Sequence, residues 1–323
     1  MTTRRNFMKS VAAASLLAAA PHRAFASKWP EKPVKILCPF APGGNTDGIA
    51  RLMAQHLSEK FGQQFFVENR TGAGGALAAE ATAKADPDGY TLMVSALAQL
   101  AIFPAMRPTG YNPMTDFTPI SNIATNPFML VVNPSFEPKT LQEFVAYVKE
   151  RPGKIVYASG GPGSVGHLTM VLFLQRAGLD MVHAPYKGGA PAMADVVAGH
   201  VPVYFGNLSE GLPHMGGGVR PLAVSGPTRA AKAPNVPTVA ESGYPGFKTE
   251  TWNGLIGPAK LPAPVVELLA NEVRVALKDP KILERLDSYG VDPIGSTPSE
   301  FKATIEADVS QWSKAVKAAN IKL

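Results

Sequence analysis

The sequence predicts an α/β protein made of two units. In two separate stretches, short apolar runs with strand character alternate with runs whose apolar residues recur at helical spacing. Such alternation is typical of a parallel sheet joined by right-handed helical crossovers. The chain has 323 residues, 46% of them hydrophobic and 17% charged, which is more than one hydrophobic core usually serves. Two lobes are therefore expected.

The first unit alternates strand and helix signals from its start. A helix is expected over 47–62 because Ile49, Leu52, Leu57 and Phe61 fall on one face. In chain order the runs are VKILC (34–38), DGIARLMAQHLSEKFG (47–62), QFFVEN (64–69), ALAAEATAKA (76–85) and TLMVSA (91–96).

The second unit repeats this alternation, and a helical tail follows it. Its runs are FMLVVNP (128–134), LQEFVAYVKERPG (141–153), KIVYAS (154–159), SVGHLTMVLFLQRAG (164–178), MVHAPY (181–186), GGAPAMADVVAGH (188–200) and VPVYFG (201–206). The tail has helical signals over 262–279, 280–290 and 299–319.

Residues 1–26 are predicted to be a cleaved export signal. A basic start with Arg4 and Arg5 precedes an apolar run of ten residues and an A-x-A sequence, which is the pattern of a secreted leader and too short for a membrane span. The paired arginines, with Phe7 two residues later, are typical of the twin-arginine route. We therefore expect a soluble protein of the periplasm that begins at Ser27 after cleavage.

The excess of basic residues belongs mainly to this leader. Of the 31 Lys and Arg, four precede residue 27, whereas none of the 25 Asp and Glu does, so 27 basic residues face 25 acidic ones after cleavage. A nearly balanced chain without basic runs gives no support for a nucleic-acid or anionic-membrane partner. Cys38, the only cysteine, cannot form an internal disulfide and is expected to be buried in its apolar run.

Two glycine-rich loops, APGGNTDG (41–48) and SGGPGSVG (159–166), each follow a strand and open a helix. Free backbone N–H groups and the positive end of a helix dipole attract anions to such turns, and glycine lets a ligand approach the main chain. The hydroxyls of Thr46, Ser159 and Ser164 add donors. Ordinary turn chemistry would explain either loop alone, but one loop in each unit indicates that both hold an anionic ligand in a cleft.

The second loop also matches the G-x-G-x-x-G fingerprint of dinucleotide-binding proteins through Gly161, Gly163 and Gly166. Asp180 lies 19 residues beyond Gly161, near the spacing of a ribose-binding acid, but it precedes the next strand instead of ending it. The periplasm also supplies no free nicotinamide cofactor. Because the twin-arginine route exports folded proteins, including some loaded with cofactors, an exported cofactor-dependent α/β oxidoreductase stays the alternative.

No other pattern indicates catalysis or a metal site. No serine lies in G-x-S-x-G, the six histidines form no H-x-x-x-H pair, and one cysteine makes a zinc site improbable. We expect no cofactor, no metal and no catalytic residue. His167 either forms a hydrogen bond to the ligand or to another group of the cleft, or it only packs against neighbouring side chains. Asp47, the only acid in either loop, either stabilises the first turn of its helix or contacts a ligand ammonium group.

Several long segments carry a family resemblance: KILCPFAPGGNTDGIARLMAQHLSEKFGQQFFVENRTGAGG, DPDGYTLMVS, YASGGPGSVGHL, HAPYKGGAPAMADVVAGHV, and PNVPTVAESGYPGF with TWNGLIGPA. From Trp29 to the C-terminus the chain resembles the Bug, or TctC-type, receptors, the periplasmic substrate-binding proteins of tripartite tricarboxylate transporters. The resemblance implies a type II periplasmic-binding-protein fold, in which two α/β lobes close on a ligand like a Venus flytrap. Lobe 1 would be 27–126 plus 251–323, and lobe 2 would be 127–250.

The resemblance also implies a monomeric, non-enzymatic receptor for a small organic carboxylate. Its partners would be the integral-membrane subunits of a tripartite tricarboxylate transporter, or a sensor protein. Main-chain N–H groups, hydroxyls and ordered waters of both loops would hold the carboxylate, at the matching positions Gly43, Gly44, Asn45, Thr46, Ser159, Gly160, Gly163 and Ser164. The second-tier candidates are Asp47, Ala73, Ser95, His167 and Asn207.

Two departures from the family pattern bear on the ligand. Many such receptors carry an acid where the FGN sequence has Gly206, and its absence disfavours a ligand with an ammonium group. The segment SALAQL (95–100) replaces more polar stretches and would make the pocket more apolar. Both departures favour a carboxylate without an amino group, aromatic acids included.

Overall fold

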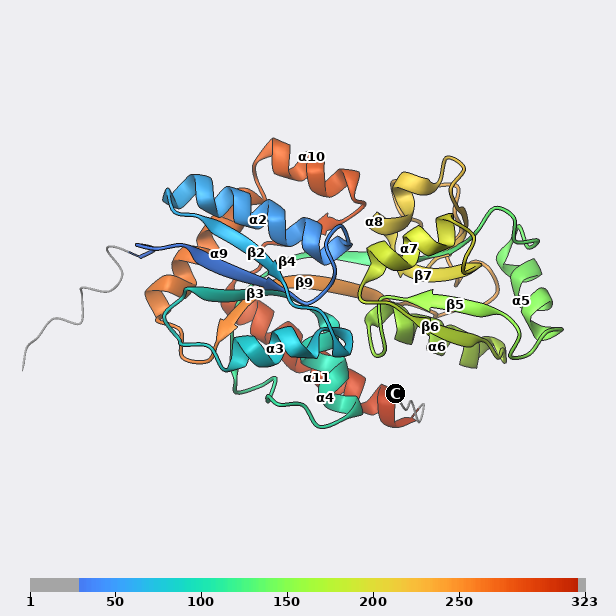
Figure 1. Ribbon diagram of the computed structural model, residues 1–323, viewed down its shortest axis with the longest axis horizontal. Coiled ribbons are helices and arrows are strands. Elements are labelled where there is room, and N and C mark those ends of the chain that lie inside the picture. The colour runs from blue at the N-terminus through green and yellow to red at the C-terminus, as the bar shows by residue number, and fades with distance from the viewer. Residues whose placement is uncertain (1–28, 319–323) are drawn as a thin grey trace, which may run out of the picture.

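The computed structural model describes residues 29–318, and the predicted leader at 1–26 lies outside them. The chain forms two α/β parts that lie side by side (Figure 1). One mixed sheet of ten strands runs through both parts in the order β2-β1-β3-β9-β4-β7-β5-β6, and β8 and β10 also pair with β4. The two parts are therefore joined by strands that share backbone hydrogen bonds.

The first part, called lobe 1 below, is built on parallel strands, namely β1 (Val34–Cys38), β2 (Phe65–Asn69) and β3 (Thr91–Ala96). Its helical elements are α2 (Asn45–Phe61), η1 (Ala73–Gly75), α3 (Ala76–Ala83), η2 (Ala98–Ile102), α4 (Phe103–Met106), α9 (Ala263–Ala276), α10 (Pro280–Ser288) and α11 (Pro298–Ala318).

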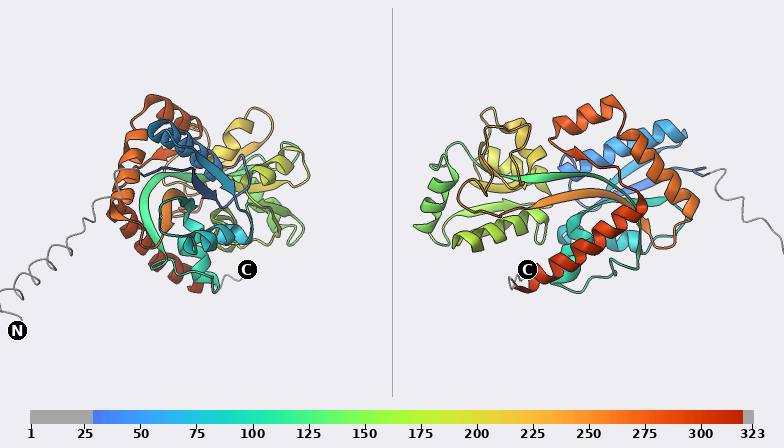
Figure 2. Two further views of the ribbon diagram at one scale, coloured as in Figure 1. Left: turned by 60° about the vertical axis from the view of Figure 1, so that its left-hand side comes forward. Right: turned by 180° about the vertical axis from the view of Figure 1, so that it is seen from behind.

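The helices of lobe 1 cover both faces of its sheet. On one face, α2 and α9 bury Ile49 and Leu269 in a core shared with β1. On the other face, α11 packs beneath the sheet, as Figure 2 shows from behind, and buries Phe301. Gly254 makes room for that ring, because a Cβ at this position would overlap it. The last helix in the sequence is thus fixed against a strand near the middle of the sheet.

The second part, called lobe 2, contains the strands β5 (Val156–Ser159), β6 (Val182–Pro185), β7 (Val203–Asn207) and β8 (Arg220–Val224). Its helices are α5 (Leu141–Lys149), α6 (Val165–Ala177), α7 (Gly189–Val197), α8 (Leu208–Gly211) and η3 (Leu212–His214). Local signals define the helix ends: Thr140 and Ser164 cap α5 and α6 through their hydroxyls, and Gly178 ends α6 in the left-handed conformation.

Two long strands pass between the lobes, β4 (Phe117–Val132) and β9 (Glu250–Pro258), which pair antiparallel to each other and are seen in Figure 2. The short β10 (Asp292–Pro293) pairs with β4. The alternation of strands and helices predicts parallel pairing, and this prediction is wrong for these strands, which pair antiparallel. Each carries the chain across to the other lobe, one outward and one back, so they run in opposite directions. The strand predicted at 128–134 overlaps only the last five of the 16 residues of β4.

The predicted lobe boundaries relate to these crossing strands. The boundary between 126 and 127 falls inside β4, and the boundary between 250 and 251 falls at the start of β9. This division of the chain stays a prediction. None of the helices in residues 29–318 is long and apolar enough to cross a membrane.

Candidate ligand-binding site

The two glycine-rich loops face each other between the lobes. The first loop follows β1 and leads into α2, and the second follows β5 and leads into α6. The lobes touch beside them, where the N–H of Ala41 donates to the carbonyl of Lys187 at 3.0 Å. Between the loops lies a cavity of about 40 Å³ lined by Phe40, Gly44, Asn45, Thr46, Ala96, Phe128, Gly160, Ser164, Val165, Gly166, Gly189, Tyr204, Asn207, Glu210 and Thr251.

Backbone N–H groups at both helix starts are available to a ligand. In α2, the N–H groups of Thr46 and Asp47 form no hydrogen bond with any other described group, and the same holds for Val165 and Gly166 in α6. Thr46, Val165 and Gly166 line the cavity. With the positive ends of the two helix dipoles, these donors favour an anion in the cavity.

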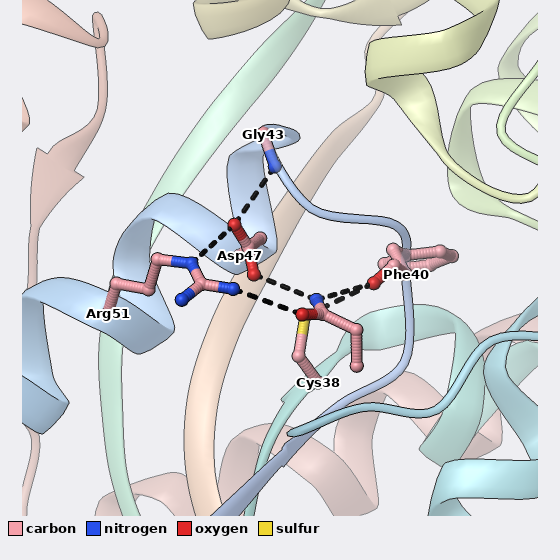
Figure 3. Close-up of polar contacts among 6 residues, drawn as sticks. Cys38, Phe40, Gly43, Asp47 and Arg51 are labelled. Carbon is pink, nitrogen blue, oxygen red and sulfur yellow. Dashed lines mark hydrogen bonds and ion pairs between the residues drawn. The ribbon is translucent and has the colours of Figure 1, made fainter. Parts of the chain in front are cut away.

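Asp47 holds the first loop in place (Figure 3). Its carboxylate accepts the N–H of Gly43 at 2.9 Å, Nε of Arg51 at 2.9 Å and Nδ2 of Asn69 at 2.8 Å. Burial opposes ionisation, but these hydrogen bonds outweigh it and lower the pKa of Asp47. Of its two possible roles, the contacts therefore support stabilisation of the loop.

Cys38 lies beneath the first loop, where its thiol contacts the carbonyl of Phe40 (Figure 3). It is buried, as predicted. Burial raises the pKa of the Cys38 thiol to about 12, so the reactive thiolate does not form at neutral pH.

His167 holds the second loop in the same way. The N–H of Gly163 donates to Nδ1 of His167 at 3.1 Å, and Oγ of Ser164 accepts the His167 N–H at 3.3 Å. Burial and the neighbouring His183 lower the pKa of His167 to about 3, so its ring stays neutral and Nδ1 stays an acceptor. In both loops, the third residue of the helix bonds back to a glycine N–H four positions earlier.

A second histidine, missed by the sequence reasoning, completes the support of the second loop. The ring of His183 stacks on that of His167 at 4.1 Å and lies 2.6 Å from Oγ of Ser159. The hydroxyl of Ser159 is fully buried and also accepts the N–H of Gly161 at 3.1 Å. The pairing of β5 with β6 brings His183 there, and the sequence alone does not give that register.

A buried network of side-chain amides connects the first loop to both crossing strands and to lobe 2. Nδ2 of Asn45 donates to Oδ1 of Asn253 at 2.7 Å and of Asn126 at 3.3 Å. Asn126 donates in turn to Asn207 at 3.0 Å, and Ser209 donates to Oδ1 of Asn45 at 2.8 Å. The start of α2 is therefore fixed relative to β4, β9 and the end of β7.

The structure places six of the predicted site residues at the cavity, namely Gly44, Asn45, Thr46, Gly160, Ser164 and Asn207. Gly43 and Asp47 instead line a second cavity of about 370 Å³ outside α2, together with Arg51, Ser209, Glu210 and Tyr289.

The remaining predicted residues lie outside the lining of the cavity between the loops. Ser159, Gly163 and His167 lie behind the second loop and bond within it. Ser95 is fully buried and bonds to the carbonyl of Ala96. Ala73 lies in a turn with φ of 49°, next to Gly74, whose backbone approaches the second loop.

Sequence reasoning assigned no site role to nine of the residues that line the cavity, and two of the segments that supply them matter most here. One is a third glycine turn, Gly188–Gly189, which opens α7; the adjacent glycines in YKGGAPAM were its signal. The other is Glu210 in α8, beside Tyr204 in β7. The acid lies close behind a strand end, but nothing in its spacing shows that it turns into the cleft.

The dinucleotide fingerprint has a structural explanation. Gly166 lets α6 approach β7 closely, because a Cβ there would lie 2.7 Å from the carbonyl oxygen of Phe205. Asp180 precedes β6, which is parallel to β5, so it lies at the end of the sheet opposite the second loop. Its position therefore does not suit a ribose contact. In the part of the chain that the structure describes, no cluster of three or more metal-ligating side chains occurs.

Two α/β lobes joined by crossing strands, with unpaired N–H groups of two helix starts beside a cavity between them, are the features of a solute receptor of the periplasmic-binding-protein class. A solved structure described as a periplasmic transporter has a TM-score of 0.88 and 41% sequence identity, covering 91% of this chain and 99% of its own. The predicted fold is confirmed. Residues 49–321 match the sequence model of the Tripartite tricarboxylate transporter family receptor, TctC, and the chain belongs to this family.

Relatives of known name agree with this assignment. BugT of Bordetella pertussis is 35% identical over 301 residues, which are 92% of each protein. An R. palustris protein solved with adipate is 35% identical with a TM-score of 0.88, covering 91% of this chain and 99% of its own. MatC of Rhodopseudomonas palustris with bound malate is 33% identical with a TM-score of 0.85, covering 89% and 100%.

Acidification from pH 7 to pH 5 should destabilise the protein through His167. The pKa of His167 is about 3 in the folded protein, whereas the pKa of a histidine in the unfolded chain is about 6.5. The unfolded chain binds the proton first, so this contribution to stability is full above about pH 6.5 and falls as the pH drops towards the folded value. The amide oxygen of the variant His167→Asn can accept the Gly163 N–H. Between pH 7 and pH 5 the free energy of unfolding of this variant should fall by about 2 kcal/mol less than that of wild type.

Urea unfolding followed by circular dichroism at both pH values measures this difference. His214→Asn is the matched control, because His214 lies in η3 and its ring forms no hydrogen bond or ion pair with another described residue. This variant should lose as much stability between the two pH values as wild type does. The same pH dependence in wild type and His167→Asn would mean that His167 is not held neutral in the folded protein.

Proposed function

We propose that this chain is a periplasmic solute receptor that binds a small organic carboxylate between its lobes. The observation that carries the proposal is the pair of facing helix starts, α2 and α6, with unpaired N–H groups beside one cavity. No lysine or arginine is among the described residues that line this cavity. Main-chain dipoles would therefore meet the ligand's charge.

The family relatives support this ligand class. Adipate and malate, held by two of the solved relatives, are both organic acids with carboxylates at their ends. The family description also supports the partner: the receptor would deliver its ligand to the membrane subunits of a tripartite tricarboxylate transporter. Delivery would depend on a hinge movement at β4 and β9, with the closed form binding ligand more tightly than the open form.

We assign the chain no catalytic role. Ser159 and His183, which lie behind the second loop, are the pair of residues that most resembles a nucleophile and its base. The Ser159 hydroxyl, however, is fully buried and accepts the Gly161 N–H, so its contacts are those of a group that shapes the loop. The ligand-binding role goes to the residues that line the cavity, with Gly43, Ser159, Gly163, Asp47 and His167 as their support.

Export by the twin-arginine route is part of the proposal, and the arginine pair supports it. Replacing Arg4 and Arg5 with lysine should leave the full-length precursor in the cytoplasm, because the route reads the arginine pair itself. Cell fractionation with mass spectrometry of the N-terminus measures the outcome. Unchanged processing to a Ser27 start would contradict this route and leave ordinary secretion in its place.

Adding charge at the second helix start should abolish tight binding. Ser164→Asp keeps an oxygen that can cap α6 but places a negative charge at the cavity wall. Carboxylate affinity should fall by at least about 30-fold, since charge-assisted hydrogen bonds are replaced by repulsion. Calorimetry with the tightest acid from an organic-acid panel that includes malate and adipate measures the change.

The matched control is Thr140→Asp. Thr140 caps α5 in the same lobe by accepting the N–H of Glu143 at 3.1 Å, but it does not line the cavity. This variant should bind like wild type. Wild-type affinity in folded Ser164→Asp would refute the proposed site.

A further inference from the structure

A carboxylate from lobe 2 forms part of the cavity wall, beside the first loop of lobe 1. Glu210 is only 9% exposed and lies between the cavity of the two loops and the larger cavity outside α2, since it lines both. Neither the loop-stabilising contacts described above nor the proposed binding of a single carboxylate explains an acid at this place.

The two carboxylate oxygens of Glu210 are held differently. Oε2 accepts the Tyr204 hydroxyl at 2.7 Å and the Asn207 N–H at 3.0 Å. Oε1 accepts only longer bonds, from Nδ2 of Asn207 at 3.3 Å and from the N–H of Asn45 at 3.4 Å. Oε1 is therefore the oxygen that can take a further and stronger donor.

Capping of α8 explains only part of this arrangement. Glu210 reaches back to the N–H of Asn207, the residue that precedes α8, as acids at the third helical position often do. That role needs one oxygen near Asn207. It requires neither burial of the carboxylate nor a contact between Oε1 and lobe 1.

Glycines make the room that this carboxylate occupies. A Cβ at Gly189 would overlap the Glu210 carboxylate, and a Cβ at Gly44 would lie 3.4 Å from Oε1. A Cβ at Gly206 would overlap the ring of Tyr204, whose hydroxyl bonds to Glu210. Gly189 thus makes room for the Glu210 carboxylate, and Gly206 makes room for the Tyr204 ring that bonds to it, so the position of the acid is built into the fold.

The charge of this carboxylate has no basic partner. Among the described residues, no lysine, arginine or histidine forms an ion pair with Glu210, and its bonding partners are uncharged groups. Burial raises the pKa of Glu210, because ionisation is costly away from water. A donor from the ligand, above all a cation, would offset that cost.

We propose that Glu210 sets the class of ligand: it favours a carboxylate whose second polar group is a hydrogen-bond donor, best an ammonium group, and disfavours a second carboxylate. The inference rests on the proposed function, because the ligand's first carboxylate is held by the helix starts while the second group meets Oε1. The acid that is absent at Gly206 is thus supplied by Glu210. The ligand class becomes an amino or hydroxy acid, which replaces the expectation of a ligand without an amino group.

Matched acids of two chain lengths test this selectivity. The short series is succinate, 4-hydroxybutanoate and 4-aminobutanoate, and the long series is adipate, 6-hydroxyhexanoate and 6-aminohexanoate. Wild type should bind the amino acid at least about tenfold more tightly than the diacid of the same length, with the hydroxy acid between them. Calorimetry at neutral pH gives each affinity.

Glu210→Gln keeps the size of the side chain and removes its charge. The preference for the amino acid should fall to below about threefold, mainly because the diacid binds more tightly. Glu241→Gln is the matched control, since Glu241 belongs to lobe 2 and pairs with Arg229 away from the cavity. It should leave the preference unchanged, and circular dichroism checks that both variants fold.

The possible outcomes separate the role of Glu210 from the proposed function as a carboxylate receptor. A wild type that prefers the diacids, or an unchanged preference in folded Glu210→Gln, would overturn the role of Glu210 and leave the carboxylate receptor intact. Should the variant not fold, the order of affinities in wild type decides alone. If none of the six acids binds, the role of Glu210 falls, and if a wider organic-acid panel also fails, the proposed function falls with it.

Discussion

The hydrogen bonds of the Asn45 side chain are the constraint on which the binding cleft depends. This one amide bonds to both strands that cross between the lobes, at Asn126 and Asn253, and accepts from Ser209 of lobe 2. Because it is the first residue of α2, it fixes the start of that helix to the two crossing strands. Buried amides with unmet hydrogen bonds are costly, so a change in the angle between the lobes must rearrange this network. We infer that hinge position and the geometry of the first loop are coupled through it.

The two loops reach the same solution with different chemistry. In lobe 1 a carboxylate, Asp47, accepts the glycine N–H of its loop, and in lobe 2 a neutral imidazole, His167, does so. Each acceptor takes up a loop donor and leaves the N–H groups of the following helix turn unpaired. Donors that are already oriented require little ordering when a ligand binds. No lysine or arginine of the described residues lines the cavity, so we infer that these donors hold the ligand's carboxylate and that the acid in the lining, Glu210, sets the selectivity.

Local signals explain why the alternating strands and helices and both glycine loops could be predicted from the sequence. The family resemblance then placed these loops in a two-lobed receptor. What escaped prediction depends on pairing between distant segments. The antiparallel course of β4 and β9 is set by lobe crossing, and His183 reaches Ser159 only through the register of β5 with β6. Glu210 was missed because its position in the cavity wall depends on its contacts with Gly44, Gly189 and Tyr204. The two glycines are far from one another in the sequence, and Tyr204 carries no signal of its own. Because Gly206 stands where many such receptors have an acid, the cleft was expected to lack one, but the next helix, α8, supplies Glu210.

The most direct test of this account is a crystal structure with the tightest-binding organic acid. The account predicts that the ligand carboxylate lies between the lobes and accepts a hydrogen bond, at about 2.7–3.2 Å, from at least one free N–H group of each helix start, Thr46 or Asp47 in α2 and Val165 or Gly166 in α6. A carboxylate that pairs instead with a lysine or arginine side chain, or that contacts neither helix start, would contradict it.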